Sequence, residues 1–390
     1  MVLYGLGTTI GAGIYALTGE LAGIAGYYAP VSFLLASLLA GFTAMSFAEL
    51  SGRFPRAAGA ALYTQQGFRS THLATITGLL VFVAGVVSSA ALVNGFVGYF
   101  HEFVAFDRFW IILGLCAILG GLAMWGIAQS VFVAGLLTLL EIGGLLLVVY
   151  AGAGSLGQLP MRLLELVPDF SLSSWTGIFA GTILAFYAFI GFEDMVDVAE
   201  EVRQVKKTLP RAIIITLLVT TLLYFLVMLV AVLAMPPEKL AASKAPLSAI
   251  YTHYTGNSAT IISVIGSFAI INGALIQVIM GARVLYGLAR RKQLPACFGK
   301  LNPVTRTPVL ATGVAIGLVL LLAVYGRLSG LARGTSIVML SVFAVVNFSL
   351  VLVKRREPRP PDTIVFPVWV PLFGFITSLG FVVLEITRLW

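Results

Sequence analysis

Charged residues, cysteine and histidine are all scarce in this sequence, and each scarcity excludes a class of protein. Only 10% of the 390 residues are charged, whereas a soluble domain carries roughly a quarter. The two cysteines, Cys116 in an apolar run and Cys297 in a basic loop, give no basis for a disulfide framework. The three histidines are isolated from one another, so we expect no metal site and no bound cofactor.

Apolar residues make up the bulk of the chain. They account for 59% of it, and the mean hydropathy is +1.02. In hydrocarbon only helices and closed barrels satisfy their backbone polar groups. Barrel strands alternate apolar and polar residues, whereas the apolar runs here are long and continuous. The sequence therefore predicts an all-α integral membrane protein in contact with a lipid bilayer.

Eleven apolar runs approach the length of a spanning helix, which needs about 20 residues. They cover residues 2–25, 30–51, 73–98, 109–127, 131–153, 176–201, 211–235, 259–288, 308–325, 335–353 and 366–388. We therefore predict about eleven transmembrane helices. The connection 236–258 is long and reads as short amphipathic helices with proline breaks. It is either a connector on the membrane surface or a lid over a central site.

Lysine and arginine are distributed unevenly between the predicted loops. Sixteen of the 24 fall on the side that is cytoplasmic if the N-terminus is cytoplasmic, and seven fall on the other side. Basic residues concentrate in cytoplasmic loops. The bias predicts a multi-pass protein of the plasma (inner) membrane with a cytoplasmic N-terminus. Because orientation accounts for the net charge of +8, we expect no nucleic-acid partner.

Two predicted helices contain interruptions. The helix at 2–25 carries glycines at positions 5, 7, 11 and 13, and such a cluster either allows close packing or marks an unwound point. In the helix at 176–201 the apolar run ends abruptly at Glu193 and Asp194, and a carboxylate inside a span usually faces a cavity or a partner. The two helices are five apart, which is typical of inverted five-helix repeats with the binding site at the breaks.

The chemistry of such breaks suits a zwitterion. Unwinding frees backbone N–H and C=O groups near the middle of the membrane. The N-terminus of a half-helix attracts a carboxylate, and freed carbonyls attract an ammonium group. An amino acid presents both groups.

Four motifs resemble those of the amino acid–polyamine–organocation (APC) superfamily. They are Gly11-Ala12-Gly13-Ile14; Phe189-Ile190-Gly191-Phe192-Glu193 continuing through Glu200-Glu201 to Leu209-Pro210-Arg211; Ser46-Phe47-Ala48-Glu49-Leu50 with Arg53-Phe54-Pro55; and Ala282-Arg283-Val284-Leu285-Tyr286 with Leu294-Pro295. Any one of them is a weak signal, but together they extend over most of the chain. The sequence differs from the family in starting almost inside its first helix and in lacking a twelfth helix. Truncation and a short subfamily both remain open.

The resemblance implies a LeuT-type fold with discontinuous first and sixth helices. The transporter core would be 1–353, made of one repeat at about 1–153 and a second at about 176–353, and 354–390 would hold a peripheral eleventh helix.

The resemblance also implies a substrate site between the two breaks. In the first break, the α-carboxylate would be held by Thr9, Ile10, Gly11, Ala12 and Gly13. In the second, carbonyls of Tyr187, Ala188 and Ile190 would hold the α-amino group, with Phe189 and Gly191 in the same stretch. Tyr187 falls where relatives place an aromatic gate over the substrate.

Glu141 lies near the middle of the predicted span 131–153. Burial disfavours the charged form of a carboxylate, so Glu141 could load and release a proton near neutral pH. We interpret it as the coupling residue or as the partner of a nearby cation. The alternative is a protonated glutamate with a structural hydrogen bond.

Glu193 and Asp194 are interpreted as part of an inner gate. With Asp197, Glu200 and Glu201 they make the inner half of the sixth helix acidic, and positions 193, 197, 200 and 201 share one face of an α-helix. The alternative is a solvated face or structural ion pairs with Arg53, Arg56 or Arg203. Glu49 and Arg53, four residues apart, are expected to pair with each other.

These patterns predict a secondary active transporter (permease) for amino acids that works by alternating access. Proton-coupled symport is favoured, with sodium coupling open. An amino acid exchanger (antiporter) and a non-transporting nutrient sensor of the same fold remain alternatives. No acidic residue lies on the outer side of either break, which argues against polyamines and cationic amino acids. An enzyme is not expected, because no HExxH, GxGD or GxSxG motif occurs.

Overall fold

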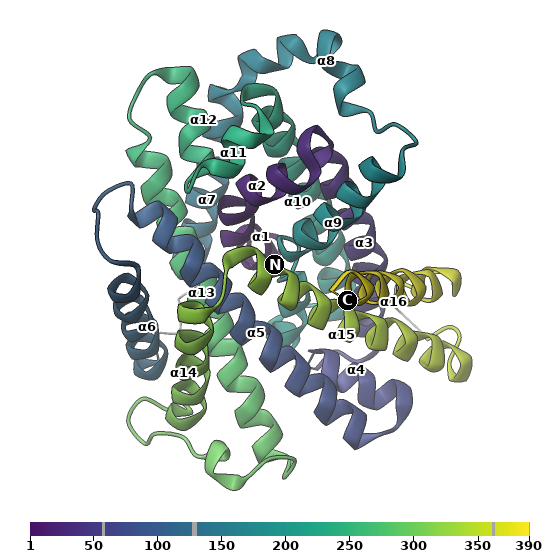
Figure 1. The fold of residues 1–390 in the computed structure, drawn as a ribbon. Helices are drawn as coiled ribbons and strands as arrows, with labels where there is room; N and C mark the ends of the chain where they lie inside the picture. The colour runs from purple at the N-terminus through teal and green to yellow at the C-terminus, as the bar shows by residue number, and fades with distance from the viewer. Residues whose placement is uncertain (57–58, 127–130, 361–362, 390) are drawn as a thin grey trace.

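The computed structural model describes residues 1–56, 59–126, 131–360 and 363–389, and within them the chain is a bundle of helices (Figure 1). Its α-helices are α1 (Val2–Ile10), α2 (Ala12–Ala25), α3 (Ala29–Arg53), α4 (Gly59–Phe68), α5 (Thr71–Phe100), α6 (Arg108–Trp125), α7 (Val131–Ala151), α8 (Leu159–Leu166), α9 (Leu172–Tyr187), α10 (Val205–Ala234), α11 (Pro237–Ala242), α12 (Pro246–Thr255), α13 (Thr260–Arg290), α14 (Val309–Tyr325), α15 (Leu328–Arg356) and α16 (Trp369–Leu389). Short 3-10 helices are η1 (Gly26–Tyr28), η2 (Ala153–Gln158), η3 (Phe192–Glu201) and η4 (Ala296–Gly299).

The all-α membrane architecture is confirmed. In the described parts of the chain, eight helices are long and apolar enough to cross a membrane, or up to nine if the bent pair that joins α7 to α8 counts as one span. One of the eight, Gly13–Arg53, joins two of the predicted runs. Every predicted run contains a helix, but the count of eleven spans stays a prediction.

Several boundaries differ from those expected. Helices α4 and α8 lie in segments predicted as loops, because they are too short to give an apolar run of spanning length. Helix α15 continues through Arg356, so residues 354–356 belong to it and not to the peripheral helix, which begins at Trp369 as α16. The expected short helices between 236 and 258 are present as α11 and α12, each beginning at a proline.

The first predicted helix is broken, as expected. Helix α1 ends at Ile10, and α2 begins at Ala12. Between them Gly11 has φ −42° and ψ −140°, a turn of the backbone away from helical geometry. The glycine cluster therefore marks an interruption as well as close packing.

The second break separates α9 from η3. Helix α9 ends at Tyr187, and Gly191 has φ +126°, which favours glycine over any other residue. The expectation of an α-helix through residue 201 was wrong, because Phe192–Glu201 is a 3-10 helix with non-helical backbone at Val198. In a 3-10 helix residues three apart share a face, so the predicted α-helical alignment of positions 193, 197, 200 and 201 does not apply.

The two breaks touch each other through backbone. A Cβ placed on Gly191 would lie 2.1 Å from the Thr8 carbonyl oxygen, and one on Gly13 would lie 2.8 Å from the Cα of Ala188. Thr8, which comes earlier in the first break, contacts Gly191, which comes later in the second. Gly13, which comes later in the first break, contacts Ala188, which comes earlier in the second. The breaks therefore run antiparallel.

One buried hydroxyl holds both breaks. The Tyr224 hydroxyl of α10 lies 2.8 Å from the Thr9 carbonyl oxygen and 3.1 Å from the Ala188 carbonyl oxygen, and its one O–H is shared between these two acceptors. Tyr224 is fully buried, and its ring packs against Phe33 and Phe189. A carbonyl released by a helix break is costly in an apolar interior unless a donor reaches it, so Tyr224 stabilises both interruptions.

Replacing Gly191 by alanine should disrupt this contact. The Gly191→Ala variant combines an unfavourable positive φ, costing about 1–3 kcal/mol, with a clash against backbone that cannot swing away. We expect a clear fall in the melting temperature of the purified protein, measured by intrinsic fluorescence. Gly114→Ala is the matched control, since a Cβ there meets nothing within 4 Å. Equal melting temperatures for the two variants would contradict the close approach.

Candidate functional site

The two breaks line a hollow that α5 and α13 complete; we call it the upper hollow. Its lining from the breaks is Thr8, Thr9, Gly11, Gly13, Tyr187, Ala188 and Ile190, and its lining from α5 and α13 is Ser88, Leu92, Gly273, Ile276 and Gln277. Six of the ten residues predicted to bind substrate are therefore brought together around one space.

The N-terminus of α2 opens at this hollow. Helix α2 begins after Gly11, and no side chain caps its first backbone N–H groups. Uncapped N–H groups at a helix start, together with the helix dipole, favour an anion. Because Gly11 and Gly13 carry no side chain, the backbone itself is accessible from the hollow.

Three of the other four predicted binding residues play other parts. Ile10 and Phe189 are fully buried in the core, and Phe189 packs its ring on Phe33 and Tyr224. Gly191 faces the Thr8 carbonyl rather than the hollow. The side chain of Ala12 lies outside the described part of the structure.

Tyr187, the predicted gate, is anchored to α5. Its hydroxyl lies 3.0 Å from Ser88 Oγ and donates to the Ser88 carbonyl oxygen at 3.1 Å. The side chain is only 4% exposed, so in this structure it forms a fixed wall of the hollow. Its role as a moving gate stays a prediction.

The lining contributed by α5 and α13 was missed by sequence analysis. Ser88 and Gln277 are polar residues within long, mostly apolar runs, and such a run does not reveal which face points to a cavity. Thr8 lay within the glycine-rich stretch and was not singled out. The polar character of Ser88 and Gln277 was the available signal.

A second, lower hollow adjoins the first. It is lined by the carboxylates Glu193, Asp194 and Asp197 of η3 and by Val81, Ala84, Gly85, Ser88, Ile190, Gln277, Met280, Gly281, Val284 and Met339. Glu193 accepts a hydrogen bond of 2.8 Å from the backbone N–H of Gly191 and so braces the second break. The Oδ2 atom of Asp194 is buried and has no hydrogen-bond partner among the described residues.

Arg53, which the alternative interpretation pairs with this acidic segment, pairs with Glu49 instead. No lysine or arginine is among the described residues that line the lower hollow. The hollow therefore has its carboxyl groups on the η3 side and, apart from Ser88 and Gln277, apolar residues on the α5, α13 and α15 sides.

Glu141 lies beside the broken first helix but lines neither hollow. Its side chain is 2% exposed, its Oε1 accepts a hydrogen bond of 3.3 Å from Asn272, and its Oε2 is buried without a partner in the described part of the chain. The Tyr15 hydroxyl of α2 donates to the Glu141 carbonyl oxygen at 2.7 Å. One turn earlier, Thr138 lies against Gly7 of α1, where an added Cβ would come 2.2 Å from Thr138 Oγ1. This stretch of α7 therefore contacts both halves of the broken helix.

Helices α11 and α12 cover the other end of α2 (Figure 1). A Cβ on Gly19 would lie 2.6 Å from the Leu240 carbonyl oxygen, and one on Gly98 would lie 2.4 Å from that of Lys244. Leu240 and Leu247 are fully buried. This segment is therefore packed tightly against α2 and α5, as a closed lid would be.

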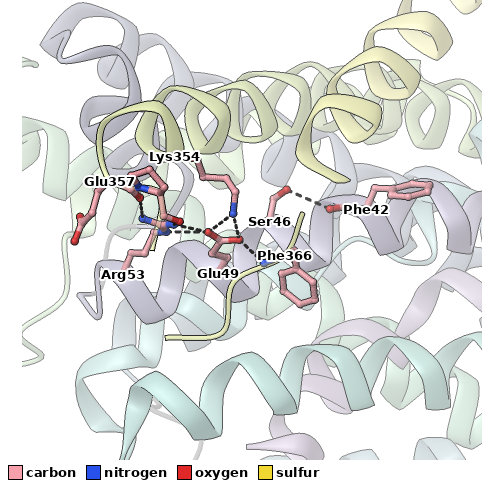
Figure 2. Close-up of polar contacts among 8 residues, drawn as sticks. Phe42, Ser46, Glu49, Arg53, Lys354, Glu357 and Phe366 are labelled. Carbon is pink, nitrogen blue, oxygen red and sulfur yellow. Dashed lines mark hydrogen bonds and ion pairs between the residues drawn. The ribbon is translucent and has the colours of Figure 1, made fainter. Parts of the chain in front are cut away.

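A buried ion cluster joins the ends of α3 and α15 (Figure 2). Glu49 pairs with Arg53 at 2.6 Å and with Lys354 at 2.6 Å, and its Oε2 accepts the backbone N–H of Phe366 at 2.9 Å. Arg53 also donates to the carbonyl oxygen of Glu357. The predicted Glu49–Arg53 pair is confirmed, and Lys354 and Phe366 are additions from a distant part of the sequence.

Glu49 is thus the acceptor for two cations and one backbone group. Removing one partner of a buried ion pair costs about 3–5 kcal/mol, because the other charge is left uncompensated. Glu49→Gln leaves two buried cations, whereas Lys354→Met leaves the Glu49–Arg53 pair intact. We expect Glu49→Gln to lower the melting temperature more than Lys354→Met does.

The control for that comparison is Glu20→Gln, since Glu20 is an exposed glutamate of α2. Its melting temperature should match that of the unmodified protein. A Glu49→Gln variant as stable as Glu20→Gln would show that the cluster contributes nothing to folding.

No group of three or more His, Cys, Asp or Glu residues in the described part of the chain is placed to hold a metal ion. The polar groups at the hollows are backbone N–H and C=O, hydroxyls, one amide and carboxylates. That set suits a small zwitterion and a proton or other cation.

Comparison with known proteins gives a consistent result. A family model described as amino acid permease matches residues 2–387. The Arabidopsis thaliana protein named "Cationic amino acid transporter 2, vacuolar" is 31% identical, over 92% of this chain and 59% of its own length. The Bacillus subtilis (strain 168) protein named "Branched-chain amino acid permease BcaP" is 26% identical, over 100% of this chain and 89% of its own.

A further Arabidopsis thaliana protein, "Cationic amino acid transporter 3, mitochondrial", is 29% identical over 94% of this chain and 63% of its own length. The chain thus spans about three fifths of the length of the two plant relatives.

Proposed function

This chain belongs to the amino acid permease family, and on that premise we propose that it carries amino acids across its membrane by alternating access. It is an integral multi-pass membrane protein. The relatives are named as transporters and permeases and not as enzymes. In alternating access the site opens to one side of the membrane at a time, so no continuous pore forms across the membrane.

The contact between the two helix breaks carries the proposal. The α-carboxylate binds at the uncapped start of α2, next to Gly11 and Gly13, where the helix dipole favours a negative charge. The α-ammonium faces the carbonyls of residues 187–190. Tyr224 donates to the Ala188 carbonyl, and a carbonyl oxygen has a second lone pair that can accept from the substrate.

The same contact supports an inverted repeat. Antiparallel breaks are what two copies of one motif related by inversion would bring together. We assign the repeats to residues 1–153 and 176–353, with α16 outside them. The distribution of lysine and arginine supports a cytoplasmic N-terminus, and we assign the chain to the plasma (inner) membrane.

Proton coupling is assigned to Glu141. A buried carboxylate with one unpartnered oxygen is stable when protonated and costly when charged. The stretch of α7 that holds it contacts α1 through Thr138 and α2 through Tyr15. Loading or releasing a proton there changes the charge beside both halves of the broken helix, and so couples protonation to the geometry of the site.

The substitution Glu141→Gln tests this assignment, because glutamine imitates the protonated, neutral carboxylate. In proteoliposomes we expect uptake driven by an inward proton gradient to fall at least about tenfold. Counterflow exchange of labelled for unlabelled amino acid should continue. Full gradient-driven uptake in the variant would remove Glu141 as the coupling group. Gradient-independent exchange by the unmodified protein would make it an exchanger, and uptake driven only by a sodium gradient would make sodium the coupling ion.

The lining of the lower hollow indicates which class of amino acid side chain the site favours. The relatives are named for different classes, cationic in the plant proteins and branched-chain in the Bacillus protein, so their names do not decide between them. The carboxylates of η3, on the inner side of the break, line a space that shares Ser88, Ile190 and Gln277 with the lining of the upper hollow. We therefore assign cationic side chains to this site. From the sequence alone, cationic amino acids were not expected, because no acidic residue lies on the outer side of either break.

The variant Asp194→Asn removes one carboxyl group from the lower hollow at little change in size. We expect it to lower the ratio of arginine uptake to leucine uptake at least about fivefold, because a cation loses a partner that desolvation makes strong. Initial rates from a labelled pair measure that ratio. Glu238→Gln, on α11 outside both hollows, is the matched control. An unchanged ratio in Asp194→Asn would exclude cationic recognition by this carboxylate.

A further inference from the structure

Three residues belong to both hollows. They are Ser88 of α5, Ile190 of the second break and Gln277 of α13. Since they come from three separate elements, they surround the place where the upper hollow adjoins the lower, and we call this place the neck. We propose that the neck selects amino acids by the length of their side chains, and that Gly85 sets its width through Gln277. This inference rests on the proposed function.

The position of the bound amino acid directs its side chain to the neck. With its α-groups held at the two breaks, the remaining walls of the upper hollow are α5 and α13. Along α5 the lining passes from Leu92 to Val81, and along α13 it passes from Gly273 to Val284. On α5 that distance is about 16 Å, at 1.5 Å per residue. A short side chain ends in the upper hollow, and a long one must pass the neck.

One side of the neck is held firmly. The Ser88 hydroxyl and carbonyl oxygen both contact the Tyr187 hydroxyl, at 3.0 and 3.1 Å. Ser88 is 5% exposed. Movement of Ser88 would therefore break a buried contact with the wall of the upper hollow.

The other side is a flexible amide next to a glycine. A Cβ on Gly85 would lie 3.2 Å from Gln277 Oε1 and 3.4 Å from the Gln277 carbonyl oxygen. The first of these distances is tighter than ordinary contact, and the second is ordinary contact. The absence of a side chain at Gly85 thus gives the Gln277 amide room to lie against α5. A methyl group at position 85 would push the amide toward the passage and narrow it.

Paired substrates that differ only in length test this inference. Arginine and 2-amino-3-guanidinopropionate form a cationic pair with the same guanidinium group, and norleucine and alanine form a neutral pair. In proteoliposomes the ratio of kcat/KM for the long to the short member should fall at least about tenfold in Gly85→Ala, since pockets of this kind discriminate single methylene groups by 10-fold or more. Gly287→Ala of α13, where a Cβ meets nothing within 4 Å, should keep the ratio of the unmodified protein.

The opposite change supplies an independent measurement. Gln277→Ala removes the amide and widens the neck, so uptake of homoarginine relative to arginine should rise about threefold or more. The double variant Gly85→Ala/Gln277→Ala should recover most of the long-to-short ratio, because the atom that clashes is gone. Gln277→Ala tests whether the neck selects by side-chain length even if Gly85→Ala fails to fold.

The possible outcomes distinguish a failure of the inference about the neck from a failure of the proposed function. If the unmodified protein takes up none of the four amino acids, the proposed function fails and the neck with it. If it takes them up but Gly85→Ala changes both members of each pair equally, or Gln277→Ala leaves the homoarginine ratio unchanged, the neck alone is overturned. If only the neutral pair is transported and its ratio falls in Gly85→Ala, the neck holds and the cationic class is abandoned.

Discussion

A helix that stops inside an apolar bundle leaves backbone N–H and C=O groups without partners, and in this protein two such stops lie against each other. Each unpaired group costs free energy comparable to a lost hydrogen bond, so the breaks require specific support. Gly191 and Gly13 allow the two backbones to touch, and Tyr224 donates to a carbonyl of each. The groups that remain at the start of α2 face the upper hollow, where a zwitterion can satisfy them.

The other features are arranged around that contact. Helix α7 contacts both halves of the first broken helix, with Glu141 at the contact. Helices α11 and α12 pack on one end of α2. Below the second break, Glu193 accepts the N–H of Gly191, and its neighbours make the lower hollow acidic. In the proposed transport cycle, a change in charge at Glu141 or in occupancy of the hollow acts on the same two interruptions.

The sequence predicted the breaks because glycine and carboxylates are conspicuous in apolar helices. Gly11, Gly13, Gly191 and Glu193 could be found in this way, and so could the pair Glu49–Arg53, which depends only on local spacing. Ser88, Gln277, Lys354 and the role of Tyr224 could not. Their importance depends on which face of a long apolar helix packs against which neighbour. A helix that is apolar on every face gives no sequence pattern from which that packing could be predicted. The 3-10 geometry of η3 was missed for a related reason, since tertiary packing at a break and not local propensity determines it.

The central claim is that the two breaks bind the α-carboxylate and the α-ammonium of an amino acid. Thermal stabilisation of the purified protein by lysine, lysinamide and Nα-acetyllysine tests it most directly, because the two derivatives each remove one of those charges and keep the side chain. The account predicts that lysine raises the melting temperature and that neither derivative does so at the same concentration. Equal stabilisation by lysinamide and lysine would contradict the account, because it would show that no carboxylate is bound at the start of α2.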